Sequence, residues 1–171
     1  RIASEFSAIF GASFVYDERG VAIWPATAIN YTSKTQYLFR INKGILDMTN
    51  DRDLNGFTPE HMRRIPFTNM IYIGDGLTDV PSMKMTRSKG GFSIAVHDSE
   101  GDTDLVDSML LQHRADFAMP ADYRPGSEME RTVSAIIRRI AARVDTDALH
   151  HTQLERAKTR IVKELQDMYD E

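Results

Sequence analysis

Apolar and polar residues alternate near the start of the chain in a pattern typical of a β-hairpin. Two short apolar runs, at 14–16 and 21–24, bracket the sequence Asp-Glu-Arg-Gly at 17–20. A short polar turn with glycine at its end is a common connection between two antiparallel strands. We therefore expect a hairpin here, and we expect Pro25 to end the strand pairing because proline has no amide hydrogen to donate.

A helix is predicted next, followed by a loop. Apolar residues recur at helical spacing over 33–47, and Ser33 can cap the start of this helix. Residues 48–59 are polar and include asparagine, aspartate, glycine and proline, which is typical of a loop.

The centre of the chain predicts three strands separated by two helices. The strands are expected at 70–73, 92–96 and 117–119, with one helix through Met83 and another near 101–112. An alternation of strands and helices is typical of a parallel sheet with crossover helices. We therefore predict an α/β fold with a doubly wound, mostly parallel sheet.

The C-terminal part is predicted to be entirely helical. One apolar stripe runs through 129–144 and a second through 154–168, with the polar residues 145–147 between them. We expect two segments, an α/β core over 1–126 and a helical segment over 127–171. The helices either pack on the core or mediate self-association.

Composition narrows the class of protein. Of 171 residues, 42% are hydrophobic and 27% are charged, and the net charge is −4. The chain therefore has no basic excess for binding nucleic acid.

No apolar run approaches the roughly 18–20 residues that a membrane helix needs. The absence of cysteine fits a reducing compartment, so we expect a cytoplasmic protein. Because the chain begins with Arg1 rather than methionine, we expect a processed or partial chain.

Two carboxylates follow the predicted strand at 70–73. Asp75 and Asp79 lie in the sequence Gly-Asp-Gly-Leu-Thr-Asp, in which Gly74 and Gly76 permit a sharp turn. Magnesium binds one or two carboxylates together with phosphate oxygens, and ligands in α/β sheets bind beyond the carboxyl ends of strands. This turn is therefore a candidate magnesium-phosphate site. The alternative is an ordinary acidic strand-to-helix turn in which Asp79 caps the next helix.

A lysine upstream supports the phosphate interpretation. Lys34 lies at the start of the helix predicted over 33–47. On its own, a lysine at such a position is usually a solvated surface residue. Together with the two downstream carboxylates, it becomes a candidate for stabilising phosphoryl charge.

Three segments, at 31–36, 70–79 and 90–96, resemble the second half of a haloacid dehalogenase superfamily phosphatase, and the phosphoserine-phosphatase-like branch is the most similar. The resemblance covers residues 10–120. It implies a magnesium-dependent phosphomonoester hydrolase that works through an aspartyl-phosphate, with a small phosphorylated metabolite as substrate.

The resemblance also assigns roles to residues. Lys34 resembles the lysine that steadies the phosphoaspartyl group, Asp75 resembles the direct magnesium ligand, and Asp79 resembles the second acid of that pair. Further candidates for substrate binding are Ser33, Gly76 and Thr78.

The nucleophile of that family, an Asp-x-Asp sequence after an apolar strand, is missing. Asp17 is the aspartate that precedes Lys34, but Arg19 follows it where the acid-base partner should stand, so Asp17 is expected to be a turn residue. We therefore expect the chain to be the C-terminal part of such an enzyme and inactive by itself. The strand at 70–73 would then expose an unpaired edge, to be covered by an N-terminal half or another chain.

Two alternatives stay open. The chain could be a non-catalytic module that binds magnesium, phosphate or a protein partner. It could also belong to a sugar-phosphate phosphatase of another branch of the superfamily, with the same reaction and a different substrate.

Overall fold

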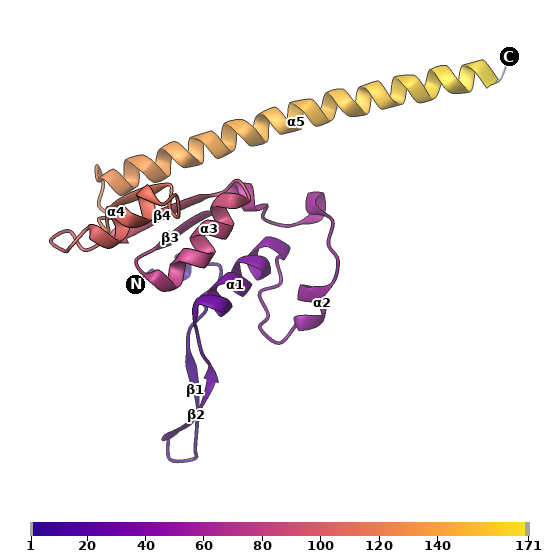
Figure 1. Cartoon of the computed structure of the whole chain (residues 1–171). Coiled ribbons are helices and arrows are strands. Elements are labelled where there is room, and N and C mark those ends of the chain that lie inside the picture. The colour runs from indigo at the N-terminus through magenta and orange to yellow at the C-terminus, as the bar shows by residue number, and fades with distance from the viewer. Residues whose placement is uncertain (1, 170–171) are drawn as a thin grey trace. The chain divides into compact units, whose positions relative to one another are not determined.

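Three parallel strands form the main sheet, in the order β3 (Ile71–Gly74), β4 (Phe92–His97), β5 (Phe117–Pro120). The helices α3 (Val80–Ser88) and α4 (Asp104–Leu111) connect them, as Figure 1 shows. The predicted alternation of strands and helices and the parallel pairing are confirmed. The strand order runs in one direction, so the three strands form a parallel α/β sheet without the reversal that defines a doubly wound one.

The computed structural model describes residues 2–169 and divides the chain into two units. The first unit is Arg1–Asp122 and the second is Tyr123–Glu171. The sheet and the candidate site lie in the first unit, and the second consists mainly of one helix.

One face of the sheet packs against the two crossover helices. Tyr72, Ala95 and Ala118 contribute to this face, and they pack with Met83 of α3 and Met109 of α4. Because side chains alternate between the faces of a strand, the small alanines of β4 and β5 meet in register and leave room for both helices. This packing holds the turn after β3 against the start of α3.

The helix α1 (Tyr31–Lys43) begins and ends earlier than predicted. Asn30 is its N-cap, and the Asn30 side chain accepts hydrogen bonds from the backbone amides of Thr32 and Ser33. The expectation that Ser33 caps the helix is therefore wrong, since Ser33 is the third helical residue and completes the capping box. The helix ends at Lys43, and its C-cap, Gly44, has a φ of 76°.

Part of the predicted loop at 48–59 is a short helix, α2 (Asp51–Asn55). The reason is a tertiary contact that no local pattern signals. The buried guanidinium of Arg40 donates to the carbonyl oxygen of Asp47 at 2.7 Å and to Asp51 Oδ1 at 2.6 Å. Arg40 therefore gathers the segment around itself and holds the start of α2 in place.

The predicted hairpin is confirmed as β1 (Ser13–Tyr16) and β2 (Ala22–Thr27), which pair antiparallel. The expectation that Pro25 ends the pairing is wrong, because Pro25 lies within β2 opposite Phe14. Both strands of a two-stranded sheet are edge strands, where proline is tolerated, and the register shifts beside this pair. Figure 1 shows the hairpin extending away from α1.

The C-terminal segment is one continuous helix of 42 residues, α5 (Glu128–Tyr169). The expected division into two helices at 145–147 is wrong. The segment contains no glycine or proline, and the hydroxyl of Thr146 donates to the carbonyl oxygen of Ala142 within the helix. Among the described residues, no helix is both long and apolar enough to cross a bilayer.

Candidate functional site

An ion pair between α1 and the turn after β3 forms the centre of the candidate site. Lys34 Nζ lies 2.7 Å from Asp79 Oδ1 and 3.2 Å from Thr78 Oγ1. Asp79 is buried, with 4% of its surface exposed. The structure thus brings together three of the residues singled out in the sequence, and it joins positions that are 45 residues apart.

A tyrosine of β3 binds the same carboxylate of Asp79 as Lys34 does. The Tyr72 hydroxyl donates a hydrogen bond to Asp79 Oδ1 at 2.5 Å, so the same carboxylate oxygen accepts from both Tyr72 and Lys34. Charge-assisted hydrogen bonds of this kind are short and strong. The two donors hold the buried carboxylate in a single position.

Gly74 is required by the path of this turn. A 3-10 turn over Leu77–Asp79 folds the chain back, with the Asp79 amide donating to the Gly76 carbonyl oxygen at 3.0 Å. A Cβ atom on Gly74 would lie 2.6 Å from Asp79 Cγ. The Asp79 side chain therefore occupies the space that any other residue at position 74 would need.

The charges of the site follow from these contacts. Burial acts to raise the pKa of the Asp79 carboxyl, but the hydrogen bonds from Lys34 and Tyr72 outweigh it, and the pKa lies below its usual value. Burial first, and then the hydrogen bond to Asp79, raises the pKa of the Tyr72 phenol well above its ordinary value. At neutral pH, Asp79 is therefore an anion and Tyr72 a proton donor.

Asp79 occupies the N-cap position of α3 but does not use its side chain as a cap. The alternative that Asp79 is a capping residue is therefore wrong. Its carboxylate points instead to Lys34 and Tyr72.

Asp75 lies at the end of β3 and is exposed to solvent. Gly76 follows, and the space beside its α-carbon is open. The exposed carboxylate is therefore next to an unobstructed stretch of backbone at the carboxyl edge of the sheet. Within residues 2–169, no group of three or more acidic or histidine side chains lies close enough to hold a metal ion without other ligands.

The Ser33 hydroxyl forms its hydrogen bonds with Asn30, whereas the Thr78 hydroxyl accepts from Lys34. The Ser33 hydroxyl accepts from the Asn30 amide at 2.7 Å and donates to the Asn30 carbonyl oxygen at 3.0 Å. Ser33 is thus engaged in the start of α1, one residue before Lys34.

Tyr72 is the site residue that the sequence reasoning missed. It lies inside an apolar run and was grouped with the core residues around it. One signal was available. Tyr72 lies two residues before Gly74, and alternate residues of a strand share one face, so Tyr72 lies on the same face as the glycine beside Asp79.

Asp17 is a turn residue, as predicted. Its Oδ1 atom accepts from the backbone amides of Arg19 and Val21, both at 2.9 Å. The Asp17 carboxylate is therefore used to close the β1–β2 turn.

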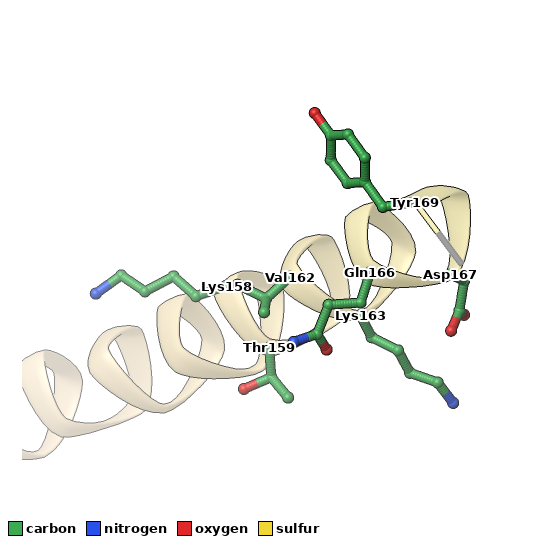
Figure 2. Close-up of a pocket in the computed structure, with 7 residues that line it drawn as sticks. All are labelled: Lys158, Thr159, Val162, Lys163, Gln166, Asp167 and Tyr169. Carbon is green, nitrogen blue, oxygen red and sulfur yellow. The ribbon is translucent and has the colours of Figure 1, made fainter. Parts of the chain in front are cut away.

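A surface hollow elsewhere lies along α5. Figure 2 shows the side chains that line it, and all of them come from the last turns of this one helix. They point away from the helix in different directions, with Lys158 and Tyr169 far apart. The hollow is thus an open groove on a helix surface rather than an enclosed binding site.

Comparison with known proteins gives little further information. No protein-family model matches the chain, and no solved structure gives a significant match. An uncharacterized protein of Borreliella burgdorferi is 40% identical over 57 residues. The match covers 33% of this chain and 18% of that protein, so the chain matches less than a fifth of the relative's length.

Proposed function

We propose that this chain contributes the metal-binding and charge-stabilising part of a magnesium-dependent phosphomonoester hydrolase of the haloacid dehalogenase type. The observation that carries the proposal is the ion pair between Lys34 and Asp79, with Nζ 2.7 Å from Oδ1, beside the exposed Asp75. Phosphoryl transfer depends mainly on positioning and on neutralising charge, and these residues supply both kinds of group at the carboxyl edge of a parallel sheet.

Each residue has a proposed role. Asp75 would bind the magnesium ion directly, because its carboxylate is exposed at the end of β3. Asp79 keeps Lys34 in position through the ion pair. Lys34, whose side chain is 29% exposed, presents its remaining ammonium hydrogens toward solvent and toward Thr78, where a phosphoryl oxygen could replace water.

The donor set fits magnesium, which takes one or two protein carboxylates and completes its shell with water and substrate phosphate. When bound, the ion would neutralise phosphate charge beside the carboxylates. Asp75 is the residue that would hold it.

The attacking carboxylate is expected to come from a strand beside β3. In the sheet formed by the described residues, β3 pairs with β4 on one side, and no described strand pairs with its other edge. Asp17 is engaged in the hairpin turn. We therefore expect no turnover from the 171-residue chain by itself.

Magnesium titration followed by amide NMR tests the proposal. We expect saturable shifts of the amide signals of residues 74–79, and we expect Asp75→Asn to abolish them. Asp145→Asn, which changes an exposed aspartate of α5, is the matched control and should titrate like the unchanged chain. Equal magnesium binding by the Asp75→Asn variant would refute the proposal.

Turnover distinguishes the proposed enzyme from the alternative, a non-catalytic module that binds magnesium or phosphate. Adding a peptide or domain that supplies an Asp-x-Asp strand should produce magnesium-dependent hydrolysis of an aryl phosphate if the proposal holds. Binding of magnesium without hydrolysis in that mixture would favour the binding module.

A further inference from the structure

Ten residues of α5 follow one another at alternating spacings of three and four, the repeat of a coiled coil, and seven of them are apolar. We call this stripe the seam. Its members are Ile137, Ile140, Val144, Asp147, His151, Leu154, Lys158, Ile161, Leu165 and Met168.

The apolar members of the seam are largely exposed. Six of them keep between 44% and 63% of their surface accessible, namely Ile137, Val144, Leu154, Ile161, Leu165 and Met168. Among the described residues of its unit, only those at 123–127 lie outside α5, and a single helix cannot bury its own stripe. Long helices in proteins gain most of their stability by packing an apolar face. The seam therefore requires a partner surface.

The polar members of the seam indicate how a second copy would bind. Asp147, His151 and Lys158 interrupt the apolar positions. In a parallel, in-register pair each of these residues would face its own copy, so Asp147 would face Asp147 and Lys158 would face Lys158. Like charges opposed in a helix interface are strongly unfavourable.

An antiparallel pair resolves these conflicts. When Asp147 lies opposite Lys158 of the second copy, twofold symmetry forms the same pair twice. This alignment also fixes the other pairs of facing residues. In an antiparallel pair the numbers of two facing residues always add up to the same total, here that of 147 and 158. They are Ile137 with Met168, Ile140 with Leu165, Val144 with Ile161, and His151 with Leu154.

A shift of this antiparallel alignment by one heptad is less favourable. In one direction the shift places the Lys158 ammonium against Ile140, in the other it places it against Leu154, and in both it separates Lys158 from Asp147. Polar residues inside a seam commonly select one register and orientation in this way.

The existing contacts of the two charged residues do not prevent the pairing. Asp147 lies 3.7 Å from Arg143, and Lys158 lies 2.8 Å from Glu155, both within α5. These pairs are exposed, and exposed pairs contribute little to stability.

We propose that α5 binds α5 of a second copy of this chain as an antiparallel pair aligned by Asp147 and Lys158. The proposal is independent of the proposed catalytic role, because none of its residues belongs to the candidate site.

Charge reversal in the full 171-residue chain tests the pairing, with sedimentation equilibrium at tens of micromolar as the measurement. Asp147→Lys should weaken dimerisation at least about tenfold, and the double variant Asp147→Lys/Lys158→Asp should recover to within about threefold of the unchanged chain. Asp145→Lys, outside the seam, is the control and should dimerise normally. Circular dichroism verifies that each variant keeps its helix.

Orientation is measured separately with a spin label. The chain contains no cysteine, so Gln166→Cys places a single label on the outer side of α5. The antiparallel alignment separates the two labels by roughly 40 Å along the helix axis, from a rise of about 1.5 Å per residue. A parallel pair would bring them within roughly 20 Å. A monomer, a short label distance, or a double variant that stays as weak as Asp147→Lys would each overturn the proposal.

Discussion

Lys34 and Asp79 form an ion pair that joins α1 to the turn after β3, with Nζ 2.7 Å from Oδ1. The Asp79 side chain is 5% exposed, whereas that of Lys34 is 29% exposed. The carboxylate therefore depends on Lys34 and Tyr72 for the interactions that water would otherwise supply. This dependence leads to predictions about stability that can be tested without a substrate.

Replacing Lys34 by methionine should lower the free energy of unfolding by about 1–3 kcal/mol, because a buried carboxylate loses its cation. Urea denaturation measures the effect. Lys84→Met, which removes an exposed lysine of α3, is the matched control and should change stability by less than about 0.5 kcal/mol. In an Asp79→Asn background, the cost of Lys34→Met should fall below about 1 kcal/mol. An undiminished cost in that background would show that Lys34 acts through other contacts.

The contribution of Asp79 to stability should depend on pH. Its pKa is lowered in the folded state, so the unfolded chain binds a proton more readily as the pH falls. The stabilisation is therefore present above the usual aspartate pKa, 3.8, and is lost as the pH falls through the lower folded value. The stability difference between the unchanged chain and Asp79→Asn should be constant from pH 7 to about pH 5 and should shrink below about pH 4. A constant difference down to pH 3 would contradict the lowered pKa.

Replacing Tyr72 by phenylalanine should remove one of the two donors to Asp79 Oδ1 and lower stability by about 1–2 kcal/mol. It should also raise the pKa of the Asp79 carboxyl toward its usual value, because the hydrogen bond favours the charged form. Carbon-detected NMR titration of the carboxyl group measures this shift. Tyr31→Phe, at an exposed tyrosine, should leave the Asp79 titration unchanged.

Alanine at position 74 should destabilise the turn by about 1–3 kcal/mol, since its Cβ would overlap the Asp79 side chain. Alanine at position 76 is the control for stability: nothing lies within 4 Å of its Cβ, and the φ of −145° suits any residue. Thermal unfolding of the two variants gives the comparison. Equal melting temperatures would mean that Asp79 can move aside without loss.

Local patterns were sufficient for most elements of the sheet. The apolar runs that became β3, β4 and β5 are short and bounded by glycine or polar residues, so neighbouring residues determine them. The hairpin was predictable for the same reason. Helix ends were less predictable. The helix α1 begins at Tyr31 because the side chain of its N-cap, Asn30, accepts from two backbone amides, and Ser33 is an equally suitable cap by residue type.

A tertiary contact accounts for one of the differences from the predicted elements. The short helix α2 depends on the buried Arg40, which donates to a carbonyl oxygen and a carboxylate farther along the chain. The continuity of α5 is a different case, because polar residues at 145–147 weaken an apolar stripe without interrupting helical hydrogen bonds.

The sequence by itself determined the parallel α/β unit, the placement of Asp75 and Asp79 after its first strand, and the turn role of Asp17. These features depend on side-chain periodicity and on turn residues that act over a few positions. Only the tertiary structure decided that Asp79 turns inward to Lys34, that Tyr72 shares the same carboxylate oxygen, and that Gly74 leaves the space for it. Those relationships depend on how α1 packs beside α3, and no spacing within the chain records that packing.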